Sequence, residues 1–291
     1  MSNINEIKNR IKGVRDTQKI TNAMYLISSQ KLQRARAALD NTRPYFDAVH
    51  NEITGLLERA DVKKSRYLTD TEEETAAPTA CACLIITADK GLAGAYNRNL
   101  LHAAEAFNKN HPSVCFYSLG EYGRRALPSI GMEINPDFLY PSTAPTLDTA
   151  REITGCLLEA YDSGRFAEIY ILYTNMKTAL QEEVLCERLL PLERSRFSPG
   201  EIAAADFEYH PSLEKALDQL IQNHLFGYIF GALTDSFCSE QNARMRAMST
   251  ANDNAEELLA ELSVTYNRLR QAAITQEITE VSAGARAQQS K

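Results

Sequence analysis

The chain has 291 residues, of which 44% are apolar and 24% charged, and its formal net charge is −7. This composition excludes a disordered chain, and the longest uninterrupted apolar run, residues 80–86, is far shorter than the roughly 20 residues that span a bilayer. The acidic balance argues against a general nucleic-acid-binding protein. Since no signal peptide is recognisable at the start, we expect an intracellular soluble protein.

Residues 4–56 predict one long helix. Mostly apolar side chains recur at alternating spacings of three and four residues, which is the seam pattern of a coiled coil. Pro44 lies inside this run and predicts a bend near residues 41–43, after which the pattern resumes. The seam positions are Ile4, Ile7, Ile11, Val14, Gln18, Thr21, Tyr25, Ser28, Leu32, Ala35, Leu39, Thr42, Phe46, Val49, Ile53 and Leu56.

The first part of this helix is basic although the whole chain is acidic. Among its first 36 residues only Glu6 and Asp16 are acidic, whereas the Lys and Arg residues are Lys8, Arg10, Lys12, Arg15, Lys19, Lys31, Arg34 and Arg36. Such a face could contact phosphates, an acidic protein surface or only water. Tyr25 is the one aromatic residue available to interleave with bases, so an acidic protein surface is the favoured partner.

Residues 76–209 predict an α/β domain. Strand patterns at 80–87, 113–119, 166–176 and 182–190 alternate with helical patterns at 97–110, 121–127 and 147–163. This alternation predicts a Rossmann-like domain with a partly parallel sheet between layers of helices. Polar segments at 63–79 and 195–205 are expected to be loops that join this domain to the terminal helices.

The loop at residues 89–94 follows the first strand and precedes a helix, where a phosphate-binding turn would lie. Its sequence matches neither of the two common glycine-rich phosphate motifs, so a tight structural turn is favoured. The six cysteines, which have no C-x-x-C or metal-ligand spacing, are expected to be small buried side chains. The histidines also lack metal-ligand spacing, and the sequence contains no catalytic constellation, so neither a metal nor a cofactor is predicted.

Residues 210–291 predict a second long helix. Its later half carries the seam Met245, Met248, Asn252, Ala255, Leu259, Leu262, Tyr266, Leu269 and Ala273. The two terminal helices are therefore expected to pair as an antiparallel coiled coil. Beyond the reach of Ile4, apolar Ile274, Ile278 and Val281 recur at helical spacing, which suggests that this tip inserts into a partner; the alternative is an ordinary frayed end.

Three stretches resemble the gamma subunits of bacterial F-type ATP synthases: IKGVRDTQKITNAM (11–24), TADKGLAGAYN (87–97) and ITQEITEVSAGARA (274–287). The third is the most specific. The resemblance implies a non-catalytic rotor shaft whose coiled coil threads a ring of three alpha and three beta subunits. The α/β domain would lie near the epsilon subunit and the membrane c-subunit ring. The three segments 1–58, 76–209 and 210–291 would then be the N-terminal coiled-coil helix, the globular domain and the C-terminal coiled-coil helix.

The resemblance also implies a function and a set of contact residues. The shaft would couple proton flux to the cycling of the beta subunits, as a peripheral subunit at the cytoplasmic face of the bacterial cell membrane. Contacts with the head and beta would involve Met24, Arg244, Gln271, Thr275, Glu277 and Glu280. Ile274, Ile278 and Val281 would lie in an apolar sleeve, and Glu208 and Tyr209 would lie at the foot, near the ring and epsilon.

Two other classes of function remain open on the sequence alone. A nucleotide-dependent enzyme could be built on residues 76–209, and the helices could form a generic coiled-coil scaffold or a nucleic-acid binder. Specific nucleotide binding would favour the first, and salt-sensitive DNA binding or self-association would favour the second.

Overall fold

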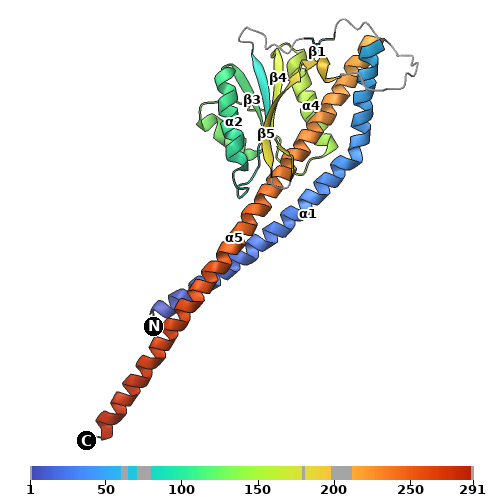
Figure 1. Ribbon diagram of the computed structural model, residues 1–291. Helices are drawn as coiled ribbons and strands as arrows, with labels where there is room; N and C mark the ends of the chain where they lie inside the picture. The colour runs from blue at the N-terminus through green and yellow to red at the C-terminus, as the bar shows by residue number, and fades with distance from the viewer. Residues whose placement is uncertain (1, 60–64, 71–79, 179–180, 198–211, 290–291) are drawn as a thin grey trace. The chain divides into compact units, whose positions relative to one another are not determined.

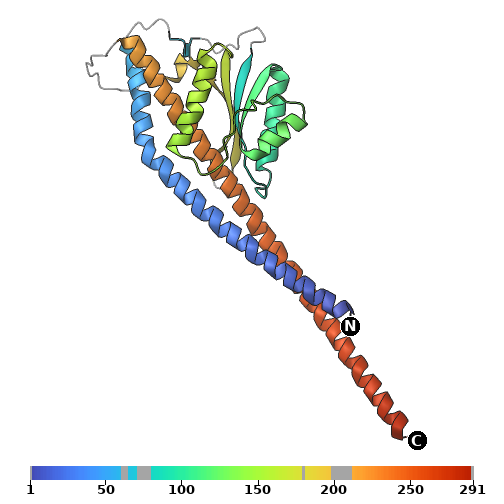
Figure 2. The same cartoon turned by 180° about the vertical axis from the view of Figure 1, so that it is seen from behind.

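The computed structural model describes residues 2–59, 65–70, 80–178, 181–197 and 212–289. It forms two compact units, one of Met1–Ser28 with Arg244–Lys291 and one of Ser29–Ala243. The long helices α1 (Ser2–Arg59) and α5 (Leu213–Gln289) each contribute to both units. Figures 1 and 2 show these helices and the central strands from opposite sides. The proposed boundaries at 58, 76 and 210 remain predictions.

The first unit is an antiparallel helix pair. The Gln18 Nε2 atom donates to Glu256 Oε1 at 3.4 Å, and Thr21 hydrogen-bonds to Asn252. Residue numbers therefore increase along α1 while those of the facing residues of α5 decrease, so the two helices are antiparallel. The predicted seam is confirmed, because in both helices each seam position is buried or half-buried while its neighbours are mostly exposed. The apolar spacing of the sequence thus determines which faces of the helices meet.

The second unit is built around a four-stranded sheet of order β3-β2-β4-β5. Its strands are β2 (Cys81–Ile86), β3 (Val114–Leu119), β4 (Glu168–Met176) and β5 (Glu182–Leu190). β2 is parallel to β3 and β4, whereas β5 is antiparallel to β4. The predicted partly parallel sheet is confirmed.

A two-residue ladder and a short 3-10 helix were not predicted. β1 (Leu68–Thr69) pairs in parallel with β6 (Leu192–Glu193), which is followed by η1 (Arg194–Arg196). β1 falls inside a segment expected to be a loop. A strand of two residues is too short to leave a periodic pattern in the sequence.

Helices cover both faces of the sheet. Figure 1 shows α2 (Tyr96–Asn110) and α4 (Leu147–Asp162) on opposite sides of it. Side chains of β2 alternate accordingly: Cys81, Cys83 and Ile85 pack with α2 and with α3 (Glu121–Ser129), whereas the residues between them pack with α4 and α5. All of β2 is buried, as expected of a central strand covered on both sides.

Within the second unit, the later part of α1 packs against the early part of α5 through aromatic side chains. The ring of Phe46 lies 5.6 Å from that of Phe226 and 6.2 Å from that of Phe230. Gly227 permits this approach, because a Cβ atom there would overlap the Phe46 ring. The helix continues through Pro44, and Figure 1 shows that α1 bends in its second half, as the proline predicts.

Closer to the end of α1, two histidines pack together. The rings of His50 and His224 are 5.4 Å apart, and each lies within 5.3 Å of the Phe197 ring. Burial lowers the pKa of His224 to about 4, assisted by His50 and Arg196 nearby. The neutral imidazole is therefore the form that this packing favours.

Candidate functional site

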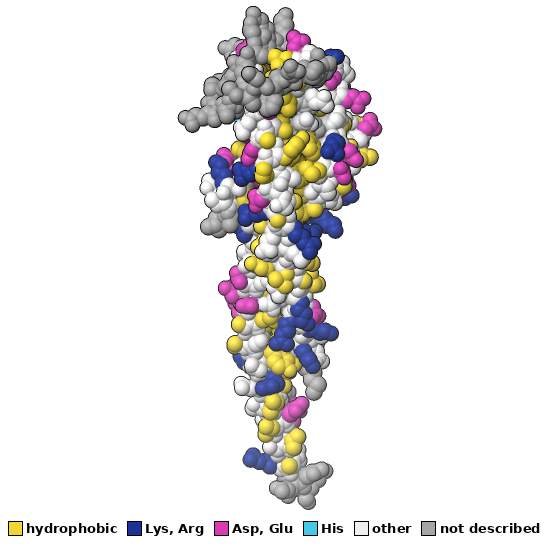
Figure 3. Space-filling view, turned by 90° about the vertical axis from the view of Figure 1, so that its right-hand side faces the viewer, with side chains coloured by type: hydrophobic (Ala, Val, Ile, Leu, Met, Phe, Trp, Pro, Cys, Tyr) yellow, Lys and Arg dark blue, Asp and Glu magenta, His cyan; other side chains and the backbone are white. Residues whose placement is uncertain are grey.

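The free end of α5 presents an apolar row to solvent. Because α1 begins at Ser2, the register of the pair leaves α5 without a facing residue of α1 beyond about position 272. The exposed fractions are 48% for Ile274, 62% for Ile278 and 73% for Val281. Their spacing places them along one side of the helix. Apolar side chains on this helix end are visible in Figure 3.

Four polar residues predicted as subunit contacts lie on the same end of α5. Gln271, Thr275, Glu277 and Glu280 are all exposed. The Thr275 hydroxyl donates to the Gln271 carbonyl oxygen at 2.9 Å, and Gln276 Nε2 donates to Glu280 Oε1 at 2.9 Å. The structure thus brings these four residues and the apolar row together on a few successive turns of one helix.

The remaining predicted contact residues are placed differently. Met24 is half-buried in the helix pair, and Arg244 is only 8% exposed. Glu208 and Tyr209, the predicted foot residues, lie outside the described residues. The roles of all these residues in contacts between subunits remain predictions.

The first part of α1 carries a surface that the sequence analysis missed. Ile20, Leu26 and Ile27 are 62%, 60% and 54% exposed, and they lie between seam positions rather than on them. Exposed basic side chains, including Lys12 and Lys19, lie on the same stretch. The sequence could have indicated this surface, because these three residues are apolar although they do not occupy seam positions.

The first residue of the loop at residues 89–94, Asp89, binds main-chain N–H groups of two distant segments at the carboxyl edge of the sheet. Asp89 Oδ1 accepts the main-chain N–H of Glu121, the first residue of α3, at 3.0 Å. It also accepts the N–H of Ser142 at 3.1 Å. Helix N-termini favour negative charge, and here a carboxylate of the chain supplies it. This favours the structural interpretation of the loop at residues 89–94.

The same loop holds a residue in an uncommon backbone conformation. Leu92 has φ +65° and its side chain is 64% exposed. Left-handed backbone is unfavourable for a residue with a Cβ atom. Gly94, two residues later, has φ +55°, a conformation that glycine adopts without this cost.

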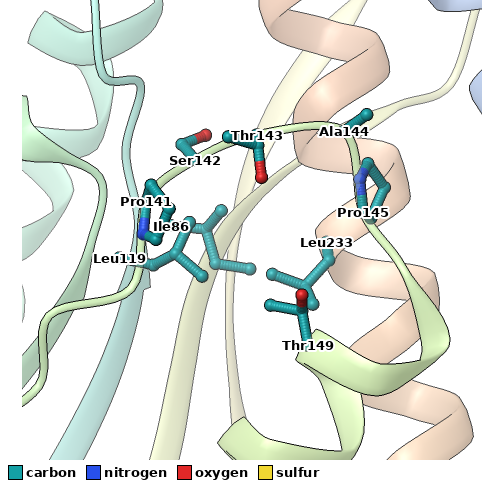
Figure 4. Close-up of a pocket in the computed structure, with 9 residues that line it drawn as sticks. All are labelled: Ile86, Leu119, Pro141, Ser142, Thr143, Ala144, Pro145, Thr149 and Leu233. Carbon is teal, nitrogen blue, oxygen red and sulfur yellow. The ribbon is translucent and has the colours of Figure 1, made fainter.

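A small recess lies at the carboxyl ends of the neighbouring strands β2 and β3, where Ile86 and Leu119 line it. Figure 4 shows the loop of residues 141–145 passing over it, with Leu119 on one side and Leu233 of α5 on the other. Its volume is about 10 Å³. Ligand pockets typically enclose about 300–1,000 Å³, so this recess has room for little more than one water molecule.

The prediction for the cysteines is only partly right. Cys81, Cys83, Cys115 and Cys238 are buried, as expected, but Cys156 is half-buried and Cys186 is exposed. Cys186 lies on β5, one of the two edge strands of the sheet, and the first six residues of β5 are not fully buried. The other edge strand, β3, is buried throughout, so the exposure of Cys186 reflects the cover on β5 in particular.

Across the described ranges, no helix has a stretch apolar enough and long enough to cross a membrane. In the same part of the chain, the structure brings together no group of three His, Cys, Asp or Glu side chains with metal-binding geometry.

Comparisons with known proteins cover almost the whole chain. A family model described as ATP synthase matches residues 3–288. An ATP synthase gamma chain from Acetivibrio thermocellus is 37% identical over 99% of this chain and 99% of its own length. One from Caldanaerobacter subterraneus is 39% identical over 96% and 98%, and the sodium-ion-specific gamma chain of Acetobacterium woodii is 33% identical over 98% of each chain.

Solved structures share the fold. A chain of the Euglena gracilis mitochondrial ATP synthase, in a structure of OSCP, F1 and the c-ring, aligns with TM-score 0.65 at 17% identity over 98% of this chain and 94% of its own. A chain from the rotor of the same enzyme aligns with TM-score 0.61 at 16% identity over 94% and 99%. The terminal helices, the sheet and the near full-length matches agree, and the chain belongs to the ATP synthase gamma chain family.

Proposed function

We propose that this chain is the central-stalk rotor subunit of an F-type ATP synthase. It couples proton flux through the membrane rotor ring to the conformational cycle of the catalytic beta subunits, in ATP synthesis or in ATP-driven pumping. The observation that carries this proposal is the apolar row Ile274, Ile278 and Val281 on a helix end that extends past its partner helix. Exposed apolar rows of this kind mark binding surfaces.

The partners follow from the family and from the surfaces described above. The end of α5 enters the ring of three alpha and three beta subunits, where the apolar row lies in a sleeve and Gln271, Thr275, Glu277 and Glu280 meet the head. Met24 and Arg244 belong to the same set of contacts. The basic stretch of α1 faces an acidic surface of beta, since opposite charges favour association.

The foot of the molecule, including Glu208 and Tyr209, lies near epsilon and the c-subunit ring. The chain is peripheral to the cytoplasmic face of the bacterial cell membrane and is held there through the complex. Solved structures titled central stalk with c-ring and rotor support a place for the chain in the rotor of the complex.

The chain performs no chemistry of its own. It acts on the beta subunits as an asymmetric ligand does, stabilising one conformation of each catalytic site at a time. Asp89 at the N-terminus of α3 and the 10 Å³ recess beside it support a structural role for the sheet over the alternative of a nucleotide-binding enzyme.

The test is co-expression of the affinity-tagged chain with the alpha and beta subunits of its own organism. The intact mass and the ATPase activity of the purified material are measured. We expect a complex of three alpha, three beta and one copy of this chain, whose activity depends on the chain. A chain that elutes alone or self-associates, with the alpha and beta activity unchanged, would overturn the proposal.

A further inference from the structure

A row of polar side chains on α5 is buried where the helix lies against the end of the sheet. Ser236, Ser239 and Asn242 are spaced three residues apart, so they lie along one side of the helix. Their exposed fractions are 0%, 0% and 7%. Buried polar groups are retained in folded proteins when they are hydrogen-bonded, and each of these three side chains binds a strand of the sheet.

The two serines bind main-chain groups of β4 beyond the end of its neighbour. β2 pairs with β4 as far as Ile85 and Leu172, while β4 continues to Met176. Two residues past that point, the Thr174 N–H donates to Ser236 Oγ at 3.2 Å, and Ser239 Oγ donates to the Thr174 carbonyl oxygen at 3.2 Å. The two hydroxyls therefore replace the hydrogen bonds that a longer β2 would have made.

The third residue of the row extends the attachment to the next strand. Asn242 Nδ2 donates to Glu182 Oε1 at 2.9 Å, and Glu182 is the first residue of β5. The row thus binds both strands of the antiparallel pair β4–β5 from a single side of α5.

The row lies at the end of the part of α5 that belongs to the sheet-containing unit. The compact unit that contains the sheet ends at Ala243, one residue after the row, and α5 continues from there as the same helix into the other unit. Earlier in α5 the contacts with the unit are apolar, through side chains such as Leu225, Ile229 and Leu233, and include hydrogen bonds of Asp218, Gln222 and Tyr228 that lie farther from this boundary. Apolar contacts are non-directional, whereas hydrogen bonds depend on distance and angle, so the row resists rotation of the helix about its axis.

We propose that Ser236, Ser239 and Asn242 are positioning residues that transmit torque between the sheet-containing unit and the continuing part of α5. This inference rests on the proposed rotor function. The head of the complex drives or is driven by the far part of α5, and the row lies directly before that part begins.

The test uses the assembled complex in membrane vesicles. Ser236→Ala with Ser239→Ala removes both hydroxyls and is compatible with a helix. The matched control is Thr234→Val, because Thr234 is equally buried but its hydroxyl donates to the Phe230 carbonyl oxygen within α5, at 2.9 Å. ATP hydrolysis and the proton gradient that it builds are measured on the same vesicles.

We expect the double variant to hydrolyse ATP at the parental rate but to lose gradient per ATP hydrolysed, and we expect the control to keep the parental ratio. A purely structural role would lower assembly and hydrolysis together and leave the ratio unchanged. An unchanged ratio in the double variant, or an equal loss in Thr234→Val, would overturn the proposal. If the parent complex builds no gradient at all, the rotor function itself fails, which is a different result.

The single variants keep the proposal testable if the double variant does not assemble. Each should show a smaller loss of the same ratio, and Ser236→Ala should also raise amide exchange of the β4 peptide containing Thr174 by about fivefold, as the loss of one hydrogen bond implies. Unchanged ratios in both single variants would contradict the proposal.

Discussion

Gly227 and Gly231, one turn apart on α5, provide a sharp test of how the two long helices pack. An added Cβ at Gly227 would overlap the Phe46 ring of α1, with the ring Cγ and Cε1 atoms at 2.7 and 2.8 Å. Nothing lies within 4 Å of the corresponding position at Gly231. We therefore expect Gly227→Ala and Gly231→Ala to have effects of opposite sign.

The magnitudes follow from the contacts. Carbon atoms pack at about 3.5–4.0 Å, so the Phe46 ring must move by roughly 1 Å in Gly227→Ala. Overpacking of this kind costs about 1–3 kcal/mol, and loosening the contacts with Phe226 and Phe230 adds about 0.5–1.5 kcal/mol. Alanine recovers about 1 kcal/mol through its higher helix propensity. The net expectation is a destabilisation of about 0.5–3.5 kcal/mol, against a stabilisation of about 0.5–1 kcal/mol for Gly231→Ala.

The assay is urea unfolding of the full chain followed by far-ultraviolet circular dichroism, since the chain contains no tryptophan. Hydrogen exchange of the peptides that contain Phe46 and Phe226 should rise in Gly227→Ala alone. Phe46→Leu should cost less stability in the Gly227→Ala background than in the parent, because the smaller side chain makes room for the new methyl group. A Gly227→Ala midpoint at or above that of Gly231→Ala would refute this account of the packing.

Three further predictions concern buried charge and the helix pair. Burial lowers the pKa of His224 to about 4 in the folded chain. As the pH falls from 7 to 5, the unfolded state therefore takes up the proton first, and the free energy of unfolding should fall by up to about 2 kcal/mol. His224→Gln should flatten this dependence of the urea midpoint on pH. The Arg188 guanidinium lies 3.5 Å from the buried carboxylate of Glu168. Arg188→Met should destabilise the chain by about 3 kcal/mol, because it leaves this carboxylate buried without its ion-pair partner. A second substitution, Glu168→Gln, should restore part of that loss, and additive effects would contradict the pairing. Leu262→Asp should reduce the helicity of the first unit, since it places a charge on a half-buried seam position, whereas removal of residues 284–291 should leave the melting of the pair unchanged.

The large elements were predictable because their patterns are long. The seam from Ile4 to Leu56 repeats often enough to define both a helix and its buried face, and the strand at residues 81–86 is apolar throughout because it is covered on both sides. The resemblance of residues 274–287 supplied the family, which the periodicity alone did not identify.

Other features could not be predicted because they depend on tertiary contacts. The exposure of Cys186 follows from the incomplete cover on the first part of β5, and local sequence does not show which strand the other elements will cover. Asp89 binds the N–H groups of Glu121 and Ser142, which are distant in sequence. The hydroxyls of Ser236 and Ser239 look like ordinary polar helix residues until the differing lengths of β2 and β4 are known.

The end of α5 beyond α1 is a helix that begins inside a paired segment. Nucleation is the unfavourable step of helix formation, and short isolated helices are only marginally stable in water. Residues 274–289 continue a helix that is already formed in the paired segment before them, so they need no nucleation step of their own. The tip is thus preorganised: a partner that engages it does not have to bear the entropy of initiating a helix, whereas a synthetic peptide of the same sequence would bind more weakly with the same contacts.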